Sequence, residues 1–141
     1  MRKVLLLALV LATSSCESWL SPGTEWVEWP ALIAVTQDQP AIDAPETAAR
    51  GASFNVGFST VATHGCIEHA RNSLVVEGLD VHIYSWQRER VNAVACTQAV
   101  TVQDHVVPVT VSVAGTATIH LHGRNNQGDQ VVLTRAVTIT P

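Results

Sequence analysis

Lysine is almost missing from this chain, since Lys3 is the only one among 141 residues. Beyond Arg2 and Lys3, six arginines face twelve acidic residues, which gives that part a formal charge of −6. A chain with this balance lacks the basic surface that binds nucleic acid or an anionic membrane. We therefore expect no nucleic-acid partner.

Long apolar runs are also missing. The longest covers residues 4–12, nine in all, whereas a helix that spans a bilayer needs about 20. Two basic residues precede this run, and three small residues, 13–15, follow it directly before Cys16. A basic start, a short apolar run and small residues are typical of an export signal.

The end of this signal, Leu-Ala-Thr-Ser-Ser-Cys at residues 11–16, resembles the lipobox of bacterial lipoproteins, whose cysteine becomes the lipidated first residue. The resemblance implies a lipoprotein signal peptide over residues 1–15, lipidation of Cys16 and attachment to the membrane through the lipid. Glu17 in the next position implies the outer membrane or the cell surface. The alternative is ordinary cleavage near Ser14 or Ser15, which gives a secreted or periplasmic soluble protein.

Only two other cysteines are present, Cys66 and Cys96. In an oxidising compartment two cysteines of one small domain most simply form a disulfide. A disulfide between them would close a loop of about 31 residues, which stabilises a fold by about 3–4 kcal/mol on the chain-entropy estimate. Paired in this way, neither sulfur can act as a nucleophile or as a metal ligand.

Alternation of apolar and polar residues dominates the C-terminal part of the chain. Val107, Val109, Val111 and Val113 alternate with polar residues or proline, and the pattern resumes at 117–121 and, after a turn at 125–129, at 131–139. Period-2 alternation with β-branched residues predicts antiparallel strands with one buried face. We expect further strands at residues 31–36, 52–62 and 94–102, and either two short strands or one bent strand over 74–83, broken at 77–78. Residues 67–72, 87–92 and 103–105 are expected to be loops or turns. The sequence thus predicts an all-β sandwich of seven or eight strands over residues 30–141, behind a tether at 16–29.

Several short motifs resemble small bacterial immunoglobulin-like lipoproteins. They are the leader ending in cysteine, Gly-Ala-Ser-Phe-Asn-Val at 51–56, Thr-His-Gly-Cys at 63–66, a second cysteine about thirty residues on, and Ala-Gly-Thr-Ala-Thr-Ile at 114–119. The resemblance implies an immunoglobulin-like antiparallel β-sandwich in the cell envelope. It transfers no catalytic residues.

Histidines are the most suggestive polar residues. His120 and His122 lie two apart on one predicted strand, so both imidazoles face the same side and are candidates to share a metal ion. His82 or His105 would supply a third ligand from a neighbouring strand. The alternative is two polar residues exposed on a sheet face. The Cys66-x-x-His69 spacing would matter for metal only if Cys66 were reduced.

A second candidate is a binding patch formed by His82, Tyr84 and Trp86, which share one parity of a predicted strand. Aromatic side chains with polar tips are enriched where a protein grips a partner. The alternative is that they pack against the next strand or the opposing sheet.

Reactive motifs are missing, because the chain has neither a Gly-x-Ser-x-Gly turn nor a glycine-rich phosphate loop. We therefore expect no enzymatic activity and no cofactor. The sequence favours a membrane-anchored interaction or scaffolding module of the cell envelope, bound to an envelope protein or a glycan. The alternative is a periplasmic metal-binding protein that uses the strand histidines.

Overall fold

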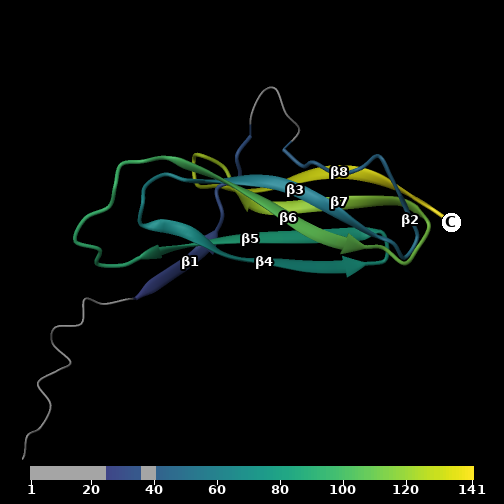
Figure 1. The fold of residues 1–141 in the computed structure, drawn as a ribbon, viewed down its shortest axis with the longest axis horizontal. Helices are drawn as coiled ribbons and strands as arrows, with labels where there is room; N and C mark the ends of the chain where they lie inside the picture. Colours follow the sequence, from purple (N-terminus) through teal and green to yellow (C-terminus); the bar gives the residue numbers. More distant parts are fainter. Residues whose placement is uncertain (1–24, 36–40) are drawn as a thin grey trace, which may run out of the picture.

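The computed structural model describes residues 25–35 and 41–141, which form eight β-strands (Figure 1). The strands are β1 (Trp26–Pro30), β2 (Thr47–Ala49), β3 (Ser53–Ala62), β4 (Ile67–Glu77), β5 (Asp80–Arg90), β6 (Thr101–Thr110), β7 (Gly115–Arg124) and β8 (Gln130–Thr140). The described residues contain no helix, so none of their segments is a helix long and apolar enough to cross a bilayer. The all-β prediction is confirmed. The signal peptide and Cys16 lie outside the described residues.

The strands form two sheets. The larger has the order β1-β5-β7-β8-β2, with β4 on the other edge of β5, and the smaller pairs β3 with β6. Figure 1 shows β3 and β6 crossing over the larger sheet. Apolar side chains of both sheets meet in one core, which gives a sandwich-like fold.

The larger sheet is mixed, which corrects the expectation of antiparallel pairing throughout. Residues 80–84 of β5 pair parallel with residues 118–122 of β7, and β2 pairs parallel with β8. The cause is the route of the chain between β5 and β7, which passes through β6 in the smaller sheet. Since that crossover returns the chain to its starting end, β7 runs in the direction of β5.

Three predicted loops are in fact strand. Residues 67–72 begin β4, β5 continues to Arg90, and β6 runs through residues 103–105. Polar residues are stable there because they bond across the strands: Arg88 Nε donates to Glu68 Oε1 at 2.8 Å, and Ser59 Oγ donates to Asp104 Oδ1 at 2.6 Å. The strand predicted at 94–102 was wrong over most of its length, since residues 91–100 lie outside the strands and are largely exposed.

The N-terminal boundary of the sheet also differs from the prediction. Residues 26–29, assigned to the tether, belong to β1 and pair with β5. Residues 31–33, predicted to begin a strand, are buried but form only isolated bridges, Leu32 with Arg124 and Ile33 with Thr60. This short segment therefore passes from the larger sheet to the smaller one.

The interior contains mostly apolar side chains and a few buried polar ones. Its apolar side chains with no exposed surface include Val56, Val81, Ile83, Val109, Ile119 and Leu121. Thr60, Ser85 and Gln87 are buried as well, with at most 1% of their surface exposed. Gln87 bonds two separate segments, because its Oε1 accepts from the Leu32 N–H at 3.1 Å and its Nε2 donates to the Val61 carbonyl at 2.9 Å.

Candidate binding face on the larger sheet

The predicted site residues of β5 lie on the outer face of the larger sheet. Val81 and Ile83 have no exposed surface and point into the core. Because successive side chains of a strand alternate between faces, His82, Tyr84 and Trp86 point outward and are half-buried among their neighbours.

β7 adds two imidazoles in register with these side chains. His82 lies opposite His120, and Tyr84 lies opposite His122. Both histidines point outward because they flank Leu121, which has no exposed surface. The five side chains form one continuous surface, here named the imidazole–aromatic face: His82, Tyr84, Trp86, His120 and His122.

The rings on this face contact one another directly. His82 Nδ1 lies 3.0 Å from His122 Nε2, which is hydrogen-bond distance. The His82 ring stacks on His120 with a centroid separation of 4.6 Å and planes 13° apart. Tyr84 stacks on His122 with centroids 4.2 Å apart. The three imidazoles and the phenol are thus a packed group rather than independent surface residues.

Burial and neighbouring charge act together on this group. Desolvation lowers the pKa of His122 below its usual value, and the nearby His82 and His120 lower that pKa further. His122 is therefore neutral at neutral pH, and its ring offers a lone pair. At the edge of the face, His120 Nε2 lies 3.2 Å from Asp80 Oδ1, a contact with 60% of the aspartate side chain exposed.

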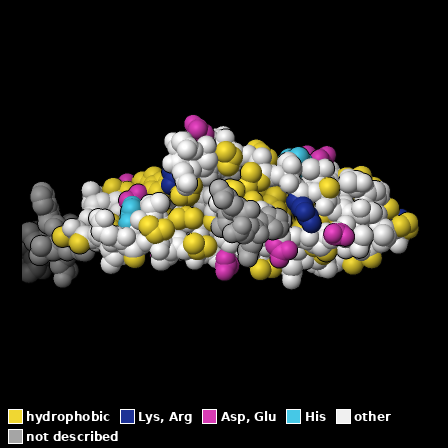
Figure 2. All heavy atoms as spheres, turned by 90° about the horizontal axis from the view of Figure 1, so that it is seen from above, with side chains coloured by type: hydrophobic (Ala, Val, Ile, Leu, Met, Phe, Trp, Pro, Cys, Tyr) yellow, Lys and Arg dark blue, Asp and Glu magenta, His cyan; other side chains and the backbone are white. Residues whose placement is uncertain are grey.

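Trp86 extends the face toward arginine residues. The guanidinium of Arg71 lies over the Trp86 ring, 4.9 Å from its centroid, and Arg71 Nε pairs with Glu28 Oε2 at 3.2 Å. A hollow of about 210 Å³ lies beside Tyr84. It is lined by Pro30, Tyr84, Ser85, Trp86, His122, Gly123, Gln130, Val131 and Val132. Another side of the molecule, seen in Figure 2, carries charged side chains scattered among uncharged groups.

His105 does not join this face, so its prediction as a third metal ligand was wrong. It lies on β6 of the smaller sheet, where its Nε2 is 2.8 Å from Thr60 Oγ1. Its ring packs on His69 with centroids 4.4 Å apart. Burial, followed by the charge of His69, lowers the pKa of His105. Of the two candidates for a third ligand, the structure brings only His82 to His120 and His122.

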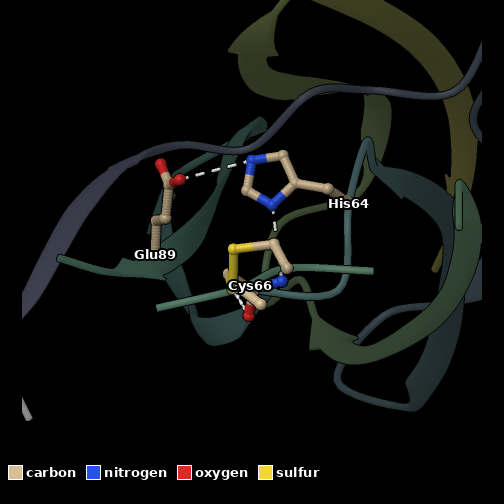
Figure 3. The surroundings of a disulfide bond; sticks show 5 residues. His64, Cys66 and Glu89 are labelled. Atoms are coloured by element: carbon tan, nitrogen blue, oxygen red, sulfur yellow. Dashed lines mark hydrogen bonds and ion pairs between the residues drawn. A yellow bond between two sulfur atoms is a disulfide. The ribbon is translucent and has the colours of Figure 1, made fainter. Parts of the chain in front are cut away.

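The disulfide between Cys66 and Cys96 is confirmed, with Cα atoms 5.3 Å apart. His64 lies beside it: one ring nitrogen accepts weakly from the Cys66 N–H at 3.4 Å, and the other lies 3.3 Å from Glu89 Oε1 (Figure 3). Among the described residues, His64, Cys66 and Cys96 form the one group of three whose ligand atoms lie within 4.8 Å of one another. Since both sulfurs are bonded to each other, they provide no thiolate for a metal ion.

Two residues near the face were not predicted. Asp80 shares the parity of His82, and this was the available signal that it reaches the same surface. Arg71 lies in the segment predicted as a loop, so nothing in the pattern placed it over Trp86.

Comparisons of the chain with protein-family models, curated proteins and solved structures found no match. The resemblance to immunoglobulin-like lipoproteins therefore stays a hypothesis.

Proposed function

We propose that this chain is a lipid-anchored, non-enzymatic interaction module of the bacterial cell envelope, and that the imidazole–aromatic face is its contact surface. The observation that carries the proposal is the clustering of Trp, Tyr and Arg side chains on an outward sheet face. These residue types are enriched at the energetic centres of protein interfaces. The leader pattern supports the anchor, and the disulfide fits an oxidising compartment.

An envelope protein fits this face better than a glycan does. The Trp86 ring is covered by Arg71, and the Trp26 ring by Arg88 at 4.6 Å from its centroid. Each contact covers one flat side of its ring, which leaves less aromatic surface on which a sugar ring would stack. Arg71 is paired with Glu28, so the face does not require a strongly acidic partner.

The immunoglobulin-like identity of the sandwich is part of the same proposal. Two facing sheets around an apolar core support it. The parallel pairing of β5 with β7 departs from the two antiparallel sheets of immunoglobulin domains. We propose a variant of that architecture in which β5 pairs with β4 along one edge and runs parallel to β7 along the other.

The anchor is tested by Cys16→Ser. Without the thiol no thioether to lipid can form, so most of the protein is expected to move from the membrane fraction to the soluble fraction. Mass spectrometry of the wild-type N-terminal peptide is expected to show the lipid on Cys16. A variant that remains wholly with the membranes would argue against lipidation.

The contact surface is tested by photo-crosslinking in intact cells. Ser73 of β4 pairs with Tyr84 across the sheet, whereas Asn55 of β3 lies exposed on the smaller sheet. A photoreactive residue at Ser73 is expected to give a discrete protein adduct, and one at Asn55 is not. Tyr84→Ala combined with Trp86→Ala is expected to lower the adduct yield about tenfold or more. Equal adducts from both positions would contradict the proposal, and an adduct removed by glycan digestion would identify a sugar partner instead.

A further inference from the structure

The imidazole–aromatic face brings three histidines together across two parallel strands. His82 of β5 faces His120 in register, and His122 approaches from the next outward position of β7. The closest approach joins His82 Nδ1 to His122 Nε2 at 3.0 Å. This pair links different strands, whereas the sequence had suggested a pair along one strand.

We propose that His82 and His122 form a clamp for a divalent transition-metal ion, and that His120 completes it as a third ligand. Two imidazole nitrogens about 2.0–2.1 Å from one ion, at an angle of about 90–110°, lie about 2.9–3.4 Å apart. The two nitrogens of the clamp are separated by 3.0 Å, which is within that range. The separation of the two nitrogens already fits an ion, and the rings must turn so that both lone pairs point at it rather than along the line that joins the nitrogens.

Entry of an ion requires one proton to move within the pair of imidazoles. One ring of the clamp carries the hydrogen that lies between Nδ1 of His82 and Nε2 of His122. That ring moves its proton to its other nitrogen when the ion enters, because a ligating imidazole nitrogen must be unprotonated. Each ring then carries its one N–H on the nitrogen that faces away from the ion.

His120 has the second contact expected of a ligand. Its Nε2 lies 3.2 Å from Asp80 Oδ1, and metal-binding histidines commonly donate their other N–H to a carboxylate. This leaves Nδ1 of His120 as the ligating atom. The nitrogens of the three rings do not all lie within 4.8 Å of one another in this structure, so His120 must rotate about its side-chain bonds to complete the site.

The donor set selects the class of metal. Imidazole nitrogens suit Zn²⁺, Ni²⁺ and Cu²⁺, while Mg²⁺ and Ca²⁺ prefer oxygen ligands. Cu²⁺ is expected to bind most tightly, in accordance with the general order of affinities. Tyr84, stacked on His122, forms one wall of the site.

The test uses the full-length chain, purified without a histidine tag. Titration calorimetry with Zn²⁺ and with Cu²⁺ is expected to give one bound ion per chain. A thermal scan is expected to show a melting temperature raised by several degrees, because the ion binds the folded state preferentially. His82→Gln and His122→Gln are each expected to weaken binding at least tenfold, and Mg²⁺ is expected to have no effect. Because each substitution also removes the contact between His82 and His122, the melting temperature of each variant is compared with and without metal.

His64→Gln is the matched control, because His64 is a half-buried histidine outside the face. It is expected to bind both metals as the wild type does. Electron paramagnetic resonance of the Cu²⁺ form is expected to show three ligating nitrogens. No thermal shift with either metal, unchanged affinity in His82→Gln and His122→Gln, or loss of binding in His64→Gln would overturn the site, and two nitrogens would overturn the role of His120. Crosslinking from Ser73 tests the contact surface independently, since it requires no added metal.

Discussion

Gln87→Leu is expected to destabilise the fold by about 2–5 kcal/mol, because it removes two buried hydrogen bonds and leaves both partners unpaired. The leucine side chain has nearly the same size as that of glutamine but neither accepts nor donates hydrogen bonds. The Leu32 N–H and the Val61 carbonyl would lose their bonds of 3.1 Å and 2.9 Å to the side chain. The Val61 N–H donates to the Leu32 carbonyl at 2.8 Å, so the same three residues form a closed set that ties β5 to β3.

The measurement is the urea midpoint, with the slope of the transition as a check that folding stays two-state. Gln130→Leu is the control, because Gln130 begins β8 and is exposed. Its effect is expected to stay within about 0.5 kcal/mol. A loss below about 1 kcal/mol in Gln87→Leu would contradict the interpretation, since the two bonds would then contribute little beyond what water restores.

Removal of the disulfide is expected to have the second large effect. Cys66→Ala combined with Cys96→Ala opens a loop with a sequence separation of 30. We expect a loss of about 3–4 kcal/mol. The melting temperature is expected to fall by roughly 10–15 °C in a domain of this size. Scanning calorimetry measures both quantities, and Cys16→Ala, which leaves the bridge intact, is the control.

Removal of the disulfide is expected to loosen residues 91–100 more than the strands. This segment lies outside the strands and is largely exposed. Besides the disulfide, a bond from the Gly65 N–H to the Thr97 carbonyl at 2.9 Å holds it to the turn before β4. Hydrogen exchange of the Gly65 amide, which donates this bond, is therefore expected to accelerate more than that of the amides in β7. Unchanged exchange there, or a fall in stability below about 1 kcal/mol, would show that the segment is held by other contacts.

The sequence predicted the strands whose valines and isoleucines alternate, because one buried face imposes that period. It predicted β7 and most of β8 from residues such as Ile119 and Ile139. It did not predict the parallel pairing of β5 with β7, because alternation tells which way a side chain points and not which strand lies beside it. The polar half of β4 was missed for a related reason, since partners such as Arg88 for Glu68 come from another strand.

The candidate site was predicted only in part, because alternation assigns a side chain to a face of the sheet but does not tell which strands are neighbours. Parity placed His82, Tyr84 and Trp86 on one face and His120 and His122 on one face. Only the register of β5 against β7 joins the two sets, and it brings His82 closest to His122. His105 was a poor candidate because β6 belongs to the other sheet.

The pairing of β1 with β5 bears on how the domain would stand above a membrane. Trp26 lies opposite Arg90, at the end of β5 that is farthest from Asp80. A lipid attached upstream of Trp26 would hold the Arg90 end close to the bilayer. His82 and Tyr84, the partners of His120 and His122, would then stand about 20–26 Å farther along β5, since a strand advances about 3.3 Å per residue. In that orientation the proposed metal site would face away from the membrane that holds the anchor.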